Sequence, residues 1–332
     1  MQETAEHPFP YAHFPTGWFG VLPSRDLKAG DVRPIHYFGT DLALFRTESG
    51  KAVVTDPFCP HLGAHLAYGG TVQGEAIRCP FHHWTFDGSG RCTSRPFAPG
   101  VNRPILKVWP TAEHNDMIFV WHDAQGRPPS WELPDFEPVR DQDMLAITAY
   151  EGMKTFPQEV LENGADWLHF VTVHNTQQLD GEVDTKSVGP HNLLFQYWTK
   201  APDGTKPKSR GLVDFYGPGY ARNLSFGERW PKVTVDHSVY VTPIDRGTLT
   251  IFSLRRLLPD ADCDMPADAL RQLSTHVEAE VRRQLERDVV IWEKKAYMDR
   301  PILSPADGPI LKYRQWYRQF YPDGPAASAK VA

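Results

Sequence analysis

Two short stretches decide the fold predicted for this chain: Cys59-Pro60-His61 and Cys79-Pro80-Phe81-His82. They are separated by 17 residues, and each places one cysteine and one histidine in a tight loop. The proline after each cysteine fixes φ and removes a backbone donor, which stiffens the loop. A thiolate and an imidazole this close together can bind one metal centre. The two loops therefore predict a site with two sulfur and two nitrogen ligands.

Two kinds of metal centre use this set of donors. A tetrahedral structural zinc is typically bound by Cys-x₂₋₄-Cys with His-x₃₋₅-His, so that each loop carries ligands of one kind. In a Rieske [2Fe–2S] cluster, two cysteines hold one iron and two histidines hold the other. Because each loop here carries one cysteine and one histidine, the spacing favours the cluster. His65 and His83 lie nearby but have no place as ligands in this motif, although His83 directly follows His82.

The residues around the two loops predict a small all-β domain. From about residue 17 to 125, short apolar runs alternate with Gly, Pro and Asp turns, as in a sandwich or barrel. A hairpin is predicted where Trp84-Thr85-Phe86 meets Asp87-Gly88, and an apolar strand at 117–121 closes the region. The proline-rich segment that follows predicts a linker at 126–145.

The second half of the chain mixes strands with helices, which gives an α+β fold class. Strands are predicted at 145–156, 233–241 and 248–252, and a helix is predicted at 159–170. In 267–298, apolar residues recur every three or four positions, which predicts one long helix.

A second group of possible metal ligands begins in the shorter predicted helix. Asp166 and His169 are i,i+3 neighbours, so the carboxylate can accept from one ring nitrogen and leave the other for a metal. His169 and His174 are five residues apart, about 140° around an ideal helix. They can share a metal only if the helix bends or ends between them. The β-branched run 171–173 favours such an ending.

Asp288 is the candidate third ligand. It lies on the apolar stripe of the long predicted helix, three residues after Leu285 and four before Trp292. A buried, unpaired carboxylate is costly, so Asp288 should have a partner. A metal is one candidate, and a salt bridge to Arg287 or Lys295 is the other. Two histidines and one carboxylate with open positions form the facial triad of non-heme Fe(II) oxygenases.

Both halves of the chain resemble the Rieske non-heme iron oxygenases. Residues 17–123 are similar to the Rieske domain of that family, and the match extends along the chain from about residue 10 to 322. Within the family, the chain is most similar to the group of 3-ketosteroid 9α-hydroxylases and cholesterol 7-desaturases. The segments that carry this narrower resemblance are 162–174, 217–223, 288–295, 307–310 and 314–321.

The resemblance implies ligands for two iron centres: a [2Fe–2S] cluster on Cys59, His61, Cys79 and His82, and a mononuclear Fe(II) on His169, His174 and Asp288. It also implies a catalytic role for Asp166, as the carboxylate bridge from His82 of one subunit to His169 of the next in a homotrimer. Asn223 is implied as a possible residue of the substrate pocket.

The resemblance also implies an organisation into domains. The second domain would be a helix-grip fold, in which an antiparallel sheet wraps around a long helix. The expected segments are an N-terminal extension at 1–16, a Rieske domain at 17–125, the linker at 126–145, a mononuclear iron catalytic domain at 146–322 and a flexible tail at 323–332.

The implied function is that of a terminal oxygenase. It would use O₂ and two electrons to hydroxylate or desaturate an apolar substrate, a steroid or sterol nucleus. The alternative within the family is hydroxylation or demethylation of an aromatic, methyl-ether or N-methyl substrate. Outside it, an electron carrier or sensor with a ligand-binding second domain and a zinc-binding structural protein stay open. No Gly-x-Gly-x-x-Gly fingerprint is present, so a separate NAD(P)H-dependent reductase is expected to supply electrons, directly or through a ferredoxin.

Composition excludes several other classes. The chain of 332 residues has 35 Lys+Arg against 41 Asp+Glu, a net charge of −6, which argues against a nucleic-acid-binding surface. No apolar run approaches ~18 residues, so no transmembrane helix is expected. The polar N-terminus does not read as a secretory signal. A reducing, cytoplasmic setting is therefore expected, with Cys92 and Cys263 as free thiols.

Overall fold

The computed structural model describes residues 9–99, 101–134, 145–176, 179–180, 189–199, 209–227 and 232–322. By its internal contacts the chain divides into two compact units. The first unit is residues 17–138 with 242–246, and the second is the rest. Half of the expected linker at 126–145, the expected tail at 323–332 and residues 1–8 lie outside the described residues. No described helix is both long enough and apolar enough to cross a membrane.

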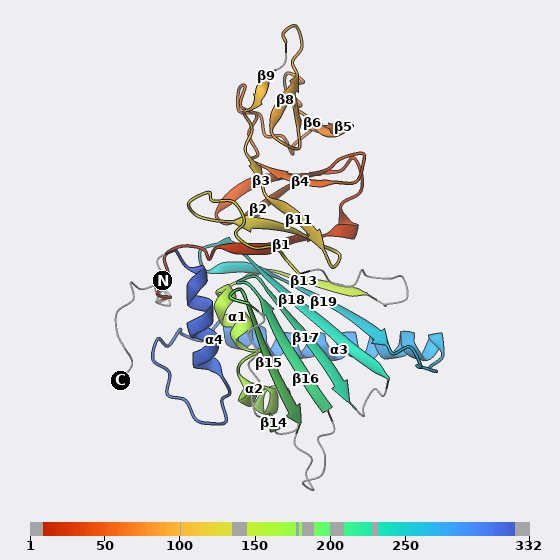
Figure 1. The fold of residues 1–332 in the computed structure, drawn as a ribbon, viewed down its shortest axis with the longest axis vertical. Coiled ribbons are helices and arrows are strands. Elements are labelled where there is room, and N and C mark those ends of the chain that lie inside the picture. Colours follow the sequence, from red (N-terminus) through yellow and green to blue (C-terminus); the bar gives the residue numbers. More distant parts are fainter. Residues whose placement is uncertain are drawn as a thin grey trace, which may run out of the picture. The chain divides into compact units, whose positions relative to one another are not determined.

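Antiparallel sheets form the first unit in its described residues, with the strand orders β1-β12-β11, β10-β4-β3-β2 and β5-β6-β7-β8-β9 (Figure 1). The elements are β1 (Gly17–Pro23), η1 (Ser24–Asp26), β2 (Val32–Tyr37), β3 (Thr40–Arg46), β4 (Ala52–Thr55), β5 (Thr71–Gln73), β6 (Ala76–Arg78), β7 (Thr85–Asp87), β8 (Arg91–Ser94), β9 (Val101–Pro104), β10 (Val108–Trp109), β11 (Thr111–His114) and β12 (Met117–His122). The predicted all-β first half is thereby confirmed.

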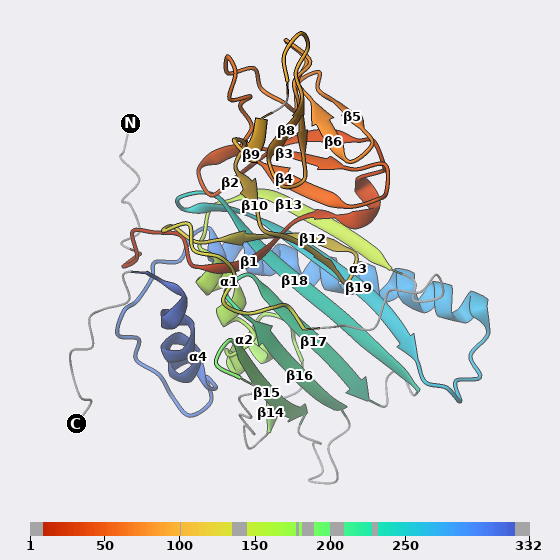
Figure 2. The same cartoon turned by 45° about the horizontal axis from the view of Figure 1, so that its top comes forward.

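The second unit is a twisted antiparallel sheet with one long helix along a face. The described strands follow the order β13-β19-β18-β17-β16-β15-β14. The elements are β13 (Ala146–Met153), α1 (Pro157–Glu162), α2 (Trp167–Thr172), β14 (Leu179–Asp180), β15 (Asn192–Thr199), β16 (Ser209–Tyr216), β17 (Tyr220–Gly227), β18 (Val233–Asp245), β19 (Thr248–Pro259), α3 (Ala267–Trp292), α4 (Ile310–Tyr317) and η3 (Arg318–Phe320). Figures 1 and 2 both show α3 running beneath the sheet, which is the expected helix-grip arrangement.

The core of the second unit lies between α3 and the sheet. Leu285 and Trp292 of α3 pack in one buried cluster with Val239 of β18 and Ile251 of β19. Trp292 is the last apolar residue of the predicted stripe, and α3 ends there, although the sequence predicts a helix to residue 298. Beyond Trp292, no further residue of that stripe is available to hold the helix against the sheet.

The helix predicted at 159–170 is two short helices, α1 and α2. Between them Asp166 is extended, with φ −93° and ψ 97°, and its side chain caps α2 by accepting from the His169 N–H. The turn approaches the sheet closely, because a Cβ at Gly164 would lie 2.7 Å from Val213 Cγ1. Glycine permits that approach. The spacing of the apolar residues alone does not predict this break in the helix.

Candidate metal centres

The two loops of the first unit fold in the same way. Cys59 and Cys79 each donate their backbone N–H to the carbonyl five residues further on, both at 2.8 Å. In each loop the residue four after the cysteine donates back to the cysteine carbonyl. That residue is Gly63 in one loop and His83 in the other, with left-handed φ values of 76° and 60°. His83 therefore occupies the turn position that glycine fills in the first loop.

The loops present histidine rings outward and cysteines inward. The rings of His61 and His82 have centroids 4.6 Å apart and lie 73° to each other. Cys59 and Cys79 are only 3% and 1% exposed. This is the arrangement expected for cysteines on an inner iron and histidines on an outer one. His83 is exposed, and the rings in contact with His61 are those of His82 and Trp84.

Two features of these loops fit a bound cluster. Nδ1 of His61 is buried and has no hydrogen-bond partner in the part of the chain that the structure describes. Burial also raises the pKa of the Cys59 thiol to about 11, so at neutral pH a bound cation is needed to hold it as a thiolate.

The spread of these side chains favours two irons over one zinc. The ligand atoms of a tetrahedral zinc, each 2.0–2.3 Å from the metal, lie roughly 3.3–3.8 Å from one another. Within the described ranges, the one set of three or more His, Cys, Asp or Glu whose ligand atoms all lie within 4.8 Å of one another is in the second unit. The loop residues are too widely spaced to belong to such a set, as a two-iron cluster requires.

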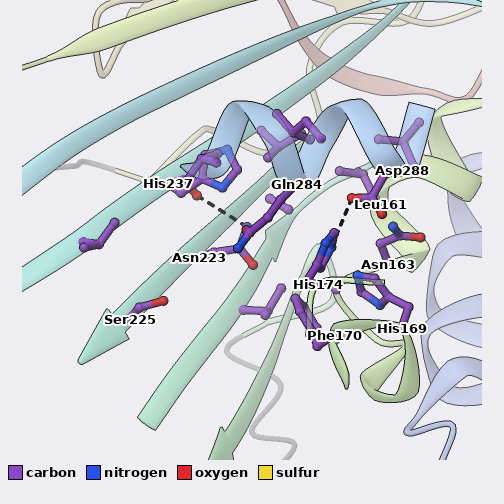
Figure 3. Close-up of a pocket in the computed structure, with 18 of the residues that line it drawn as sticks. Leu161, Asn163, His169, Phe170, His174, Asn223, Ser225, His237, Gln284 and Asp288 are labelled. Atoms are coloured by element: carbon purple, nitrogen blue, oxygen red, sulfur yellow. Dashed lines mark hydrogen bonds and ion pairs between the residues drawn. The ribbon is translucent and has the colours of Figure 1, made fainter. Parts of the chain in front are cut away.

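That close set is His169, His174 and Asp288 (Figure 3). α2 ends at Thr172, between the two histidines, as their spacing requires. The turn brings the two imidazole centroids to 4.9 Å. His174 Nε2 lies 3.3 Å from Asp288 Oδ2, with both side chains less than one tenth exposed. The predicted ligands of the mononuclear site are therefore brought together.

Asp166 supports the site differently from the sequence expectation. The ring nitrogen Nδ1 of His169 is hydrogen-bonded to the backbone carbonyl of Asp166. The Asp166 carboxylate instead accepts from the His169 backbone N–H, at 3.2 Å. Nδ1 is held in either case, which leaves Nε2 for a metal. Burial also lowers the pKa of His169, and the neutral imidazole is the form that binds metals.

The alternative partners of Asp288 are engaged elsewhere. Arg287 donates to the carbonyl of Val173 at 2.9 Å, and Lys295 pairs with Glu159 at 3.2 Å. Oδ1 of Asp288 is buried with no partner among the described residues. A carboxylate and two imidazoles buried together match the ligand set of a mononuclear non-heme iron, and the residues therefore fit that metal.

The three ligands open onto a pocket of about 170 Å³ in the second unit. Asn223, the predicted pocket residue, lines it from β17 and donates to the His237 carbonyl at 3.4 Å. His237 and Gln284 also line the pocket, and the sequence reasoning missed both. Gln284 lies one helical turn before Asp288 and could have been found from that spacing. His237 of β18 is paired with Asn223 on the neighbouring strand β17. This strand register cannot be predicted from the sequence.

The two histidines of the second loop provide a test of the cluster geometry. We expect His82→Ala to lose the visible absorption of the [2Fe–2S] cluster, because an iron ligand is removed. His83→Gly should keep that absorption, because glycine adopts the left-handed turn more readily than histidine. Visible spectra of the two purified variants check this. Loss of the cluster in His83→Gly, with retention in His82→Ala, would reverse the assignment.

Asp288→Ala tests the mononuclear site. The variant should fall from about three irons per chain to about two, with the cluster absorption unchanged, because only the facial triad loses a ligand. Glu286→Ala, which removes an exposed carboxylate from the same helix, should retain about three irons. Iron analysis of both proteins checks this. Equal iron in the two variants would show that Asp288 is not a ligand.

Comparisons with known proteins identify a family for each part of the chain. Residues 17–110 match the family model of the Rieske [2Fe-2S] domain. Residues 120–321 match that of the 3-ketosteroid 9α-hydroxylase C-terminal domain. Cholesterol 7-desaturase of Ciona intestinalis is 33% identical over 93% of this chain and 69% of its own. A probable 3-ketosteroid-9α-monooxygenase oxygenase component of Rhodococcus rhodochrous is 30% identical, over 95% and 82% of the two chains.

Solved structures show the same fold at lower identity. Dicamba monooxygenase bound to dicamba superposes with a TM-score of 0.72 at 18% identity, over 92% of this chain and 97% of that one. Taken with the two family matches, the conclusion is that this chain belongs to the Rieske non-heme iron oxygenases, with a [2Fe–2S] cluster and a mononuclear iron as cofactors and the C-terminal domain of the 3-ketosteroid 9α-hydroxylases.

Proposed function

We propose that this chain is the terminal oxygenase component that hydroxylates or desaturates a steroid or sterol nucleus. The observation that carries the proposal is the opening of the His169, His174 and Asp288 set onto a largely apolar pocket. The relatives named as cholesterol 7-desaturase and 3-ketosteroid-9α-monooxygenase support the choice of substrate class. The aromatic, methyl-ether and N-methyl alternative rests on likeness of fold alone.

The residues of the second unit divide the work at this site. When bound, the mononuclear iron supplies the activation of O₂ for attack on a C–H bond, with electrons supplied by the cluster. His169, His174 and Asp288 would hold the metal, and all three line the pocket that the substrate would fill. Leu161, Leu285 and Trp292 line that pocket and exclude water from the space that the substrate would fill.

Electrons must reach the site from another protein. The relatives are named as oxygenase components, which implies a separate reductase. We propose that this reductase is NAD(P)H-dependent and acts directly or through a ferredoxin. We also propose a homotrimer, in which the Asp166 carboxylate links His82 of one subunit to His169 of its neighbour. Its place at the start of α2, three residues before His169, supports that role. A reducing, cytoplasmic setting is part of the proposal and is supported by the four cysteines, none of which is in a disulfide.

A substrate panel tests the proposed function. The metal-loaded chain, supplied with a reductase, NADH and isotopically labelled O₂, should convert members of a steroid and sterol panel. Hydroxylated products should carry the label, and desaturated products should lack two hydrogens. Aromatic acids and methyl ethers in parallel reactions should be recovered unchanged. Product mass spectrometry is the measurement. Turnover of the ethers or acids with no steroid converted would support the alternative instead.

Asp166→Asn tests the proposed bridge. Asparagine is as good an N-cap as aspartate, so α2 and the iron content should be preserved while the negative carboxylate is lost. Steroid turnover with the reductase should fall by about 10- to 100-fold, by analogy with the loss of other groups that support a metal site. Iron analysis and turnover are measured on the same preparation. Normal turnover in Asp166→Asn would remove the bridging role.

A further inference from the structure

The pocket has a polar wall as well as an apolar one. Asn223 of β17 and His237 of β18 are directly paired across the two strands, and Gln284 of α3 lines the same pocket. Figure 3 shows Asn223 and His237 on the side of the pocket away from His169. A molecule that filled the space would thus meet the metal ligands at one end and these three side chains at the other.

Each of these three side chains keeps an unused polar group. Asn223 donates one amide N–H to the His237 carbonyl at 3.4 Å, and its Oδ1 has no partner among the described residues. His237 uses Nε2 in a 2.8 Å hydrogen bond to Ser253 Oγ, and the same residues offer no partner for its Nδ1. Within the described part of the chain, the Gln284 amide has no hydrogen-bond partner. Unpaired polar groups in a largely apolar pocket are unfavourable unless a ligand or water satisfies them.

The neighbours of His237 determine which ring nitrogen carries the proton. Nη1 of Arg255 lies 3.5 Å from Ser253 Oγ, and a guanidinium can only donate. Ser253 has one hydroxyl proton, and among the described residues His237 Nε2 is the one acceptor in contact with its Oγ, so this arrangement favours Nε2 as the acceptor. In that tautomer the ring proton is on Nδ1, which has no partner among the described residues, and His237 offers a donor.

The protonation state of His237 agrees with that hydrogen-bond pattern. Burial, together with the positive charge of Arg255, lowers the pKa of His237 to about 3. The ring is therefore neutral at neutral pH. Arg255 is itself 3% exposed and is held by a 2.7 Å hydrogen bond to Thr148 Oγ1. Ser253 is fully buried, so the orientation of the His237 ring is fixed from behind.

The charge of the pocket restricts the ligand further. Among the described residues that line it, none is Lys or Arg. Arg255 contacts this wall only through Ser253, whose Oγ lies 3.5 Å from Arg255 Nη1. Nη2 of Arg255 lies 3.9 Å from a carboxylate oxygen of Glu278. A carboxylate at this end would be desolvated without a counter-charge, which is strongly unfavourable. A neutral oxygen can be satisfied by the N–H and carbonyl groups that are present.

We propose that His237, Asn223 and Gln284 form a recognition site for one neutral oxygen of the substrate, a ketone or a hydroxyl, with Ser253 and Arg255 as positioning residues. The assignment rests on the proposed steroid oxygenase function. It adds that the protein binds the oxygen-bearing end of the substrate. Apolar contacts have no preferred direction, so a steroid could slide along the pocket. A directional hydrogen bond at a fixed distance from the metal ligands selects which C–H bond faces them.

The test compares one steroid skeleton that differs only at carbon 3. The metal-loaded full chain is titrated, without reductase, with the 3-keto, 3β-hydroxy, 3-deoxy and 3-carboxy forms of 5α-androstane, and binding is followed by tryptophan fluorescence. The keto and hydroxy forms should bind about 10-fold more tightly than the deoxy form. The carboxylate should bind most weakly. The ratio of the first two affinities separates a ketone-selective site from a hydroxyl-selective one, and either result supports the proposal.

Variants assign the effect to the residues. His237→Phe should reduce the preference for the oxygenated forms to within about twofold, while the deoxy form binds as before. Asn223→Leu provides a second variant if His237→Phe fails to fold. His276→Phe, at an exposed histidine of α3 outside the pocket, is the matched control and should keep the full preference.

The positioning role of Ser253 has its own readout. Ser253→Ala should lower the ratio of keto to deoxy affinity, because the His237 ring loses the donor that fixes its tautomer. Ser253→Thr keeps a hydroxyl and should restore the ratio, whereas a purely structural role would change both affinities together. Equal binding of the keto, hydroxy and deoxy forms by the unaltered protein would overturn the recognition site and leave the proposed function standing. Binding of none of the four forms would contradict the proposed function and the recognition site with it.

Discussion

A carboxylate and two imidazoles are buried together beneath the sheet of the second unit. The local structure of the chain brings these three groups together. Asp288 is on the apolar stripe of α3, where a lone charge would be strongly unfavourable. The neighbouring cations are bonded to other groups, so they do not neutralise it. A metal shared with His169 and His174 would neutralise it. To supply both histidines, the chain must end α2 between them, and Asp166 starts that helix as its cap.

In the first unit, too, the backbone conformation positions the ligands of the metal site. Matching backbone hydrogen bonds close both cluster loops without any contribution from a metal. Each loop also needs one residue with a left-handed φ. The loops thereby bury two thiols and hold two imidazoles outward. A buried thiol resists ionisation, so the cluster and the loops depend on each other: the loops place the ligands, and the metal makes thiolates of the cysteines.

Sequence reasoning predicts what is carried by residue type and spacing. The cluster ligands, the ending of the helix between His169 and His174, and the place of Asp288 on the buried face of α3 are all of this kind. Sequence reasoning fails for features that depend on contacts in the tertiary structure. The break at Gly164 depends on contact with Val213 across the unit. The acceptor for the His169 ring is a carbonyl because Asp166 is extended. His237 faces Asn223 only because of a strand register set over the whole sheet.

We expect this chain to hold two separate iron centres, one on the two cluster loops and one on His169, His174 and Asp288. Diffraction from crystals of the metal-loaded protein, with anomalous maps on either side of the iron absorption edge, tests it directly. We predict one elongated iron peak between the Cys59–His61 and Cys79–His82 loops, and a single compact peak among His169, His174 and Asp288. A signal at the zinc edge in the loops, or no peak beside Asp288 in crystals that contain iron elsewhere, would contradict the account.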